Sequence, residues 1–243
     1  MLYLIGLGIG DEKDISLRGI EACKKAEKVY LELYTCPLKI DISYLEKIIE
    51  KKITILDRKG VEESENIIKS AIEKDTVLLV GGDPLSATTH AEIILEARKR
   101  GVKVDIVHSS SIFTAVAETG LSLYKFGKTV SLPKPQDNYF PTSPYENISD
   151  NLSNGMHSLV LLDIGMSAEE GMSLLLELEK KVKGRIISSK TKIAVCAHLG
   201  KGSLIRYGMI KDLQKADFGE HPHCLIIPAK LNFAEEEFLE NLG

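Results

Sequence analysis

Two short apolar runs in this chain are each followed at once by glycines. Residues 2–5 lead into Gly6-Leu7-Gly8-Ile9-Gly10, and residues 77–80 lead into Gly81-Gly82-Asp83-Pro84. Because glycine has no Cβ, the backbone after each run can take a positive φ and leave space for a small molecule beside its amides. Open α/β sheets bind ligands at such strand ends. The chain is therefore expected to contain a sheet with a ligand site at the ends of its strands.

The first half of the chain alternates short β-rich apolar runs with longer amphipathic segments. Ile93, Ile94 and Ala97, for example, recur at helical spacing. Alternation of strand and helix favours a mainly parallel sheet with helices on its faces, so the predicted fold class is α/β. The predicted strands of this half are residues 2–7, 29–33, 53–56, 77–80 and 102–107.

A proline-rich segment divides the chain into two predicted domains. Pro133, Pro135, Pro141 and Pro144 are half of the chain's eight prolines, and each removes a backbone donor and resists helix formation. We therefore expect an N-terminal α/β domain over 1–130, a linker over 131–147 and a C-terminal α/β domain over 148–243. The C-terminal domain is predicted to contain strands at 159–164, 192–197, 205–209 and 225–227 and helices at 168–182 and 233–242.

Charge and composition exclude several classes of protein. The formal net charge of -4 argues against binding nucleic acid through the whole surface, because phosphates are held by clustered lysine and arginine. No apolar run approaches the roughly 20 residues that a membrane helix needs, so we predict a cytoplasmic protein. The four cysteines lie far apart and no His stands at a metal-binding interval, so we expect reduced buried thiols and no metal site.

Two common nucleotide-binding motifs fail on spacing. The first glycine turn resembles a dinucleotide fingerprint, but Asp11 stands where the third glycine belongs; Glu32, at the end of the second strand, would be the ribose ligand in that interpretation. Gly200-Lys201-Gly202-Ser203 lacks the upstream glycine and the adjacent Ser or Thr of a P-loop. Neither motif supports a nucleotide triphosphate or nicotinamide site.

The second glycine turn carries more chemistry. Gly81-Gly82-Asp83-Pro84-Leu85-Ser86-Ala87-Thr88-Thr89-His90 joins glycines to a carboxylate, a rigid proline and hydroxyls that can cap a helix. Asp83 could accept hydrogen bonds from a ligand, or it could bond its own turn. Ser109-Ser110-Ser111 follows the next strand. The two loops are therefore expected to lie side by side and form a pocket.

Several motifs together resemble the diphthine synthase family, the archaeal and eukaryotic methyltransferases of diphthamide biosynthesis. The first glycine turn and Gly-Asp-Pro alone would indicate only the wider tetrapyrrole-methylase-like superfamily. The motifs that carry the narrower resemblance are Thr-Thr-His-Ala-Glu at 88–92, Tyr-Lys-Phe-Gly-Lys at 124–128, Asn-Tyr-Phe-Pro-Thr-Ser at 138–143 and Pro-His-Cys-Leu-Ile-Ile-Pro at 222–228. Ser109 to Ser111 departs from the Pro-Gly loop usual in porphyrin and corrin methylases. The resemblance covers nearly the whole chain.

The resemblance implies a homodimer that binds S-adenosylmethionine in a cleft between two α/β domains and releases S-adenosylhomocysteine. Most of the implied contacts act through backbone groups or apolar packing. Because the glycines at 200 and 202 depart from the family's pattern, the residue that matches the family's contact could lie one position away from Leu199. His223 could instead be a structural histidine at a strand start. The cofactor contacts that carry over are Ile9, Asp83, Ser86, Ser111, Ile112, Leu162, Leu199 and His223.

The implied reaction is methylation of the amino group of 3-carboxy-3-aminopropyl-histidine on translation elongation factor 2. The amine must be neutral to attack, but neither His90 nor His198 is assigned as a base, and the catalytic residues stay unknown. Aromatic faces such as Tyr124, Tyr139 and Phe140 could stabilise the growing cationic head. Two alternatives stay open: a corrin or porphyrin C-methyltransferase, and a nucleotide-binding module without catalysis.

Overall fold

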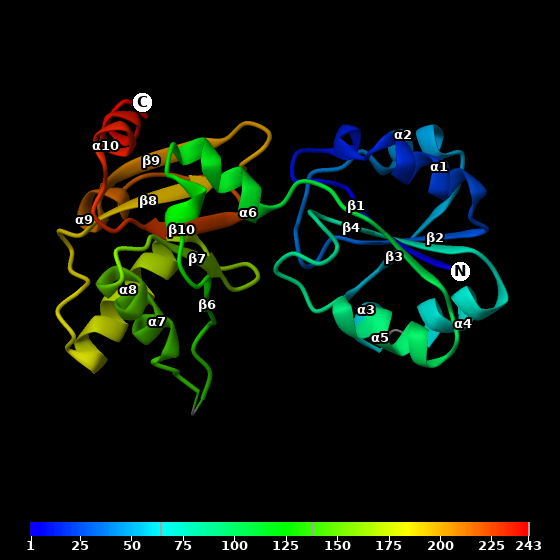
Figure 1. The fold of residues 1–243 in the computed structure, drawn as a ribbon, viewed down its shortest axis with the longest axis horizontal. Coiled ribbons are helices and arrows are strands. Elements are labelled where there is room, and N and C mark those ends of the chain that lie inside the picture. Colours follow the sequence, from blue (N-terminus) through cyan, green and yellow to red (C-terminus); the bar gives the residue numbers. More distant parts are fainter. Residues whose placement is uncertain (64, 138, 243) are drawn as a thin grey trace. The chain divides into compact units, whose positions relative to one another are not determined.

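The computed structural model describes residues 1–63, 65–137 and 139–242 (Figure 1). The chain divides into two compact units, Met1–Ala115 and Val116–Gly243. Each unit contains one five-stranded sheet with helices packed against it. The predicted α/β class is therefore confirmed.

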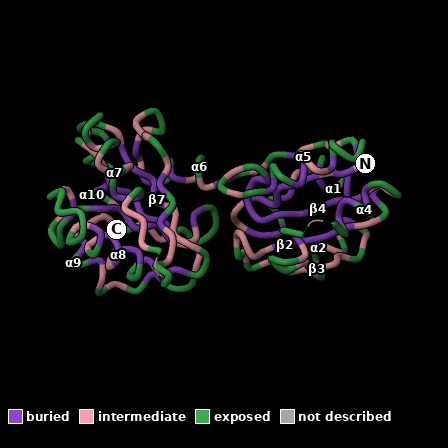
Figure 2. The backbone as a smooth tube through the Cα atoms, turned by 90° about the horizontal axis from the view of Figure 1, so that it is seen from below, coloured by how far each residue is buried: buried purple, intermediate pink, exposed green. Residues whose placement is uncertain are grey.

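The N-terminal unit is built on an all-parallel sheet with the strand order β3-β2-β4-β1-β5. β4 is central and buried along its whole length (Figure 2). The parallel arrangement brings the carboxyl ends of β4, β1 and β5 to the same edge of the sheet. The strands are β1 (Leu2–Gly6), β2 (Lys28–Glu32), β3 (Ile53–Leu56), β4 (Thr76–Val80) and β5 (Val104–Val107).

Alternate residues of the N-terminal strands enter two separate cores, one on each face of the sheet. Leu78 and Val80 pack with α4 and α5, whereas Val77 and Leu79 pack with α1 and α2. This two-sided burial explains why β4 reads as a continuous apolar run. The helices of this unit are η1 (Glu12–Asp14), α1 (Leu17–Lys25), α2 (Ile42–Ile49), α3 (Arg58–Glu62), α4 (Glu65–Glu73), α5 (Ala91–Lys99) and α6 (Ile112–Ala115).

The C-terminal unit has a mixed sheet with the order β6-β7-β10-β8-β9, in which only β6 and β7 pair in parallel. Its largest core lies between this sheet and α7 and α8. α8 begins at a capping box in which Ser167 and Glu170 bond each other's backbone amides. The strands are β6 (Val130–Leu132), β7 (Ser158–Leu162), β8 (Lys192–Ala197), β9 (Leu204–Met209) and β10 (His223–Ile227). The helices are η2 (Val116–Thr119), η3 (Leu123–Lys125), α7 (Ser143–Ser153), α8 (Ala168–Val182), α9 (Ile210–Leu213) and α10 (Phe233–Glu240).

The division between the units differs in place from the expected proline-rich linker. Residues 116–130, expected in the N-terminal domain, belong to the second unit, and the segment 131–147 contributes to β6 and α7. α7 begins at Ser143 with Pro144 in its first turn, where the missing N–H has no helical partner to lose. Proline therefore starts this helix instead of preventing it. Asn138 of the predicted motif lies outside the described residues.

In the described part of the chain, no helix combines the length and the apolar character needed to cross a membrane.

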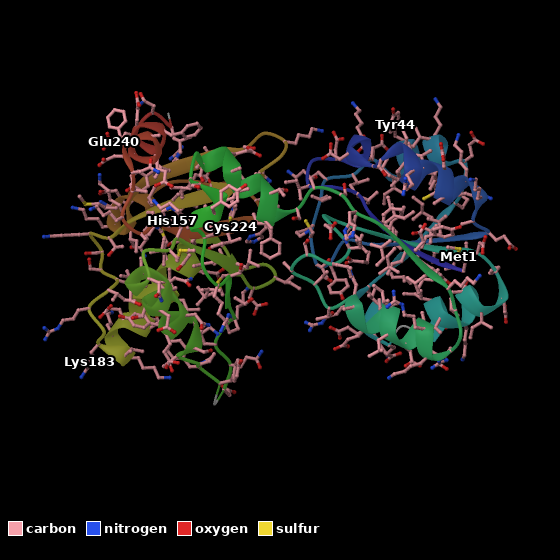
Figure 3. All side chains as sticks on the ribbon, in the orientation of Figure 1. Met1, Tyr44, His157, Lys183, Cys224 and Glu240 are labelled. Atoms are coloured by element: carbon pink, nitrogen blue, oxygen red, sulfur yellow. The ribbon has the colours of Figure 1, made fainter. Side chains whose placement is uncertain are left out.

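A buried ionic cluster attaches α10 to the rest of the C-terminal unit. The Glu235 carboxylate accepts hydrogen bonds from Lys125 Nζ (2.5 Å), the Ser122 amide (3.1 Å) and the Asn232 amide (2.9 Å). His157, labelled in Figure 3, accepts from the Ala229 amide at Nδ1, so its Nε2 carries the proton that points to Glu235 at 3.3 Å. Burial alone would raise the pKa of Glu235, but these donors lower it to about 2.

The depressed pKa of Glu235 predicts a loss of stability in acid. The carboxyl has an ordinary pKa of 4.5 when unfolded and about 2 when folded. Its contribution to the free energy of unfolding, about 3 kcal/mol, is therefore complete above pH 4.5 and is lost as the pH falls from 4.5 towards 2. Urea unfolding across this range should show the loss in the wild type and a flatter profile in Glu235→Gln. Glu237→Gln, which changes an exposed carboxyl on the same helix, is the control; if it flattened the profile equally, the cluster would not be the source.

Candidate functional site

Three loops at the carboxyl edge of the N-terminal sheet are joined by hydrogen bonds. They follow β1, β4 and β5, the three adjacent strands at one side of the sheet. Gly8 and Gly82 exchange backbone hydrogen bonds of 3.2 and 2.7 Å, and both have a positive φ. The Ile9 amide donates to Ser110 Oγ at 3.3 Å. The prediction that the β4 and β5 loops lie side by side is confirmed within this unit, and the β1 loop, which holds Ile9, lies against both.

The Asp83 carboxylate is the centre of these contacts. Oδ1 accepts from the Leu85 amide (2.9 Å) and the Ser86 hydroxyl (3.1 Å), while Oδ2 accepts from His108 Nδ1 (2.8 Å) and the Ser109 amide (3.1 Å). Burial would raise the pKa of Asp83, but these four donors lower it below its ordinary value. A carboxylate has about four acceptor positions, and all are used within the unit. Its side chain therefore joins the β4 and β5 loops instead of facing a ligand.

The other predicted residues of this unit stand on the same loops. Ser86 bonds Asp83, and its amide also donates to the Asp83 carbonyl at 3.2 Å. Ser111 is buried, and its carbonyl accepts from the amides of Thr114 and Ala115, the last two residues of α6. Ile112 is the first residue of α6 and is half-buried. Five of the eight predicted contacts are therefore gathered at one edge of one sheet.

Glycines determine how closely these loops approach. A Cβ on Gly6 would collide with the Gly82 carbonyl and would lie 2.8 Å from Ser109 Cβ. A Cβ on Gly82 would instead make only an ordinary van der Waals contact, with Ile9 Cγ2 at 4.0 Å. Gly82 is itself buried, so this position lies within the loops, beside an apolar side chain. The apolar Ile9 side chain and the polar backbone of the loops suit a ligand that has both apolar and hydrogen-bonding groups.

The remaining predicted contacts lie together at one edge of the C-terminal sheet. Leu162 ends β7, His223 begins β10, and Leu199 follows β8 by two residues. The register pairs His223 with Ala197 and Cys224 with Leu161, so the three positions are neighbours within this unit. Leu199 is buried, and the Leu162 side chain packs over Gly171 of α8.

His223 is a satisfied histidine. Its Nδ1 accepts from the Ala168 amide at 3.2 Å, so the proton is on Nε2, which donates to the Phe218 carbonyl at 3.3 Å. Burial lowers the pKa of the ring and keeps this neutral form. The ring also lies near His198 and His221. Within the described ranges, however, no three His, Cys, Asp or Glu side chains are arranged to hold a metal ion.

Glu32 does not fit the ribose-binding interpretation. Its side chain is completely buried, and its two oxygens accept from the Thr35 hydroxyl (2.5 Å) and the Thr35 amide (3.2 Å). His90, considered as a base, is 1 % exposed and bonds the Pro84 carbonyl. Both side chains are buried because the end of β2 and the start of α5 place them in the interior beneath the β4 loop. Neither can reach a substrate in the described structure.

The aromatic candidates behave differently from one another. Tyr124 is 97 % exposed, and Tyr139 is also exposed. The Phe140 ring, in contrast, is covered by Lys181, whose Nζ lies 4.5 Å from the ring centroid and donates to the Phe140 carbonyl. Phe140 is therefore engaged within its own unit, and only the two tyrosines keep free faces toward solvent.

All four cysteines carry free thiols. Cys23, Cys196 and Cys224 are buried, and Cys36 is half-buried. Burial raises the pKa of the Cys23 thiol to about 12, which keeps it protonated and unreactive at neutral pH.

The sequence predictions missed two residues that build the site. His108 and Ser110 both precede the predicted Ser111 and hold the β5 loop to Asp83 and to Ile9, respectively. Both belong to a run of four polar residues, 108–111, that directly follows a strand. That position was the available signal, because polar side chains at a carboxyl edge face the neighbouring loops.

Comparison with known proteins identifies the relatives of this fold and site. Residues 1–204 match the family described as Tetrapyrrole (Corrin/Porphyrin) Methylases. The diphthine synthase of Methanococcus vannielii is 49% identical, and that of Methanocaldococcus jannaschii is 47% identical; each comparison covers 100% of this chain and 98% of the relative. The crystal structure of a candidate diphthine synthase from Entamoeba histolytica superposes with a TM-score of 0.94 at 39% identity, covering 100% of this chain and 98% of that one. Since the likeness extends over the whole chain in both sequence and fold, the chain belongs to the diphthine synthase family of the tetrapyrrole methylases.

Proposed function

We propose that this chain transfers a methyl group from S-adenosylmethionine to the amino group of a 3-carboxy-3-aminopropyl-histidine on translation elongation factor 2. Family membership supports the reaction class. The observation that carries the proposal is the close approach of three loops, two of them glycine-bearing, at one edge of the sheet. The Asp83 carboxylate joins the β4 and β5 loops, and the Gly8–Gly82 backbone pair joins the β1 and β4 loops. The proposed place of action is the cytoplasm, where this elongation factor works.

Five residues of the N-terminal unit are proposed to hold the cofactor. When bound, S-adenosylmethionine supplies a methyl group that its sulfonium already activates. Ile9 offers an apolar side chain, and the backbone of the β4 and β5 loops offers amides and carbonyls. Asp83 contributes through its position, because its carboxylate is occupied by the loops themselves. The proposed contacts are Ile9, Asp83, Ser86, Ser111 and Ile112.

Leu162, Leu199 and His223 are the proposed contacts of the C-terminal unit. The two leucines would supply apolar surface that excludes water from the reacting groups. His223 has both ring nitrogens bonded within the unit, so we assign it a packing role instead of proton transfer. No residue is assigned as a base. The chemical requirement is only that the incoming amine has lost its proton before it attacks.

The resemblance to this family also implies a second copy of the chain as partner. We propose a homodimer, which light scattering of the purified protein tests directly. A mass near that of one 26.8 kDa chain would contradict it.

Transfer of label tests the proposed reaction. The purified protein, methyl-labelled S-adenosylmethionine and elongation factor 2 bearing the modified histidine should yield label on the factor. The factor with unmodified histidine is the control and should stay unlabelled. Label on a corrin or porphyrin instead would indicate the other tetrapyrrole-methylase chemistry, and cofactor binding without transfer would indicate a module that does not catalyse.

Substitution of Asp83 tests the cofactor loops. Asp83→Asn replaces one acceptor by an N–H, which must face the donors of either His108 and Ser109 or Leu85 and Ser86. The loops should separate, and the affinity for S-adenosylhomocysteine should fall by about tenfold or more in calorimetry. Asp105→Asn, an exposed carboxyl on β5, is the matched control. Equal affinity of the wild type and Asp83→Asn would remove Asp83 from the site.

A further inference from the structure

A buried histidine and a buried glutamate lie directly beneath the β4 loop. His90 precedes α5 and is 1 % exposed, and Glu32 ends β2 and is 0 % exposed. β2 pairs with β4, with Glu32 opposite Val80, so the glutamate stands beside the start of the Gly81-Gly82-Asp83-Pro84 turn. Two titratable groups buried this completely require partners that satisfy them.

The proton on one ring nitrogen of His90 is assigned by its partner. Nδ1 lies 3.2 Å from the Pro84 carbonyl oxygen. A carbonyl oxygen can only accept, so Nδ1 carries the hydrogen and donates it. His90 therefore holds the β4 loop at Pro84, one residue beyond the carboxylate that holds the same loop from its other side.

The second ring nitrogen has no hydrogen-bond partner among the described residues. Nε2 lies 3.6 Å from Glu32 Oε1. If both atoms were bare, a nitrogen lone pair would face a carboxylate in a buried space, which is unfavourable. One proton placed between the two atoms removes this conflict, whichever atom carries it.

We propose that Glu32 and His90 are positioning residues that hold one shared proton between Oε1 and Nε2 and thereby fix the Pro84 carbonyl and the cofactor loop. The Thr35 amide and hydroxyl hold the glutamate in place from its own side. The loop is thus held at two successive residues, by the Asp83 carboxylate and by the Pro84 carbonyl. Its relevance to S-adenosylmethionine rests on the proposed function, whereas its effect on the loop does not.

The titratable side chains that interact with Glu32 besides His90 are neutral near pH 7, so they add no charge to the pair. The titratable groups beside Glu32 are the Tyr34 phenol and the Cys36 thiol. Burial, reinforced by Glu32, raises the pKa of both, that of Cys36 to about 11, so both stay neutral near pH 7. Burial also lowers the pKa of His90 itself, and Glu32 opposes this effect.

Two readouts test the proposal, and the first needs no cofactor. Amide hydrogen exchange of Leu85 and Ser86 in the ligand-free protein should be about tenfold faster or more in Glu32→Leu and in His90→Leu than in the wild type. Ser70→Ala is the matched control, because it removes a buried hydroxyl pair with Thr76 at the opposite end of β4. Wild-type exchange rates in both leucine variants would overturn the proposal.

The second readout is the pH dependence of S-adenosylhomocysteine affinity. In Glu32→Gln the amide N–H can donate to a bare Nε2, so affinity near pH 7 should stay within about threefold of the wild type. Wild-type affinity should fall at alkaline pH as the shared proton leaves, and the variant should lack that extra fall. A Glu32→Gln protein as weak as Glu32→Leu, or with the wild-type pH profile, would contradict a shared proton. If the wild type binds no S-adenosylhomocysteine while the exchange result holds, only the proposed function fails.

Discussion

The site depends on one carboxylate that accepts hydrogen bonds from two loops at once. Asp83 bonds its own turn through Leu85 and Ser86 and the β5 loop through His108 and Ser109. The close approach beneath it is possible because Gly6 has no side chain to separate the loops. The parallel sheet brings the strand ends to one edge, but the ionised carboxyl determines how the loops lie once they are there.

The two units gather their predicted contacts by different means. In the N-terminal unit, parallel strands place three loops side by side. In the C-terminal unit, antiparallel pairing brings the end of β7, the start of β10 and the end of β8 together, which positions Leu162, His223 and the segment before Leu199. Both arrangements use strand ends, where the backbone leaves the sheet and its polar groups become available.

Local signals made much of the fold predictable. The helix predicted at 168–182 has those bounds in the structure, because its apolar stripe and its capping residues agree. The strand at 77–80 was also evident, since its burial on both faces makes it continuously apolar. The predicted linker over 131–147 includes the start of α7, because a proline in the first turn of a helix looks the same in sequence as one in a linker.

The contacts within the site were less accessible to sequence analysis. Asp83 was identified, but its partner His108 lies 25 residues away and comes near only because the chain returns through α5 to form β5 in the same sheet. The same holds for Glu32 and His90, which come from neighbouring elements and meet beneath a turn. Residue types and spacing predict which loops carry function, whereas the pairing of their side chains depends on tertiary structure.

The cluster around Glu235 affects when each unit can complete its folding during synthesis. The N-terminal unit is complete once residue 115 has been made, so it can fold while the ribosome is still translating. The C-terminal unit needs a carboxylate from its final helix to neutralise Lys125 and to satisfy His157, both made more than 75 residues earlier. Until Glu235 has been synthesised, the C-terminal half of the nascent chain holds a lysine and a histidine without the carboxylate that they bond in the folded unit.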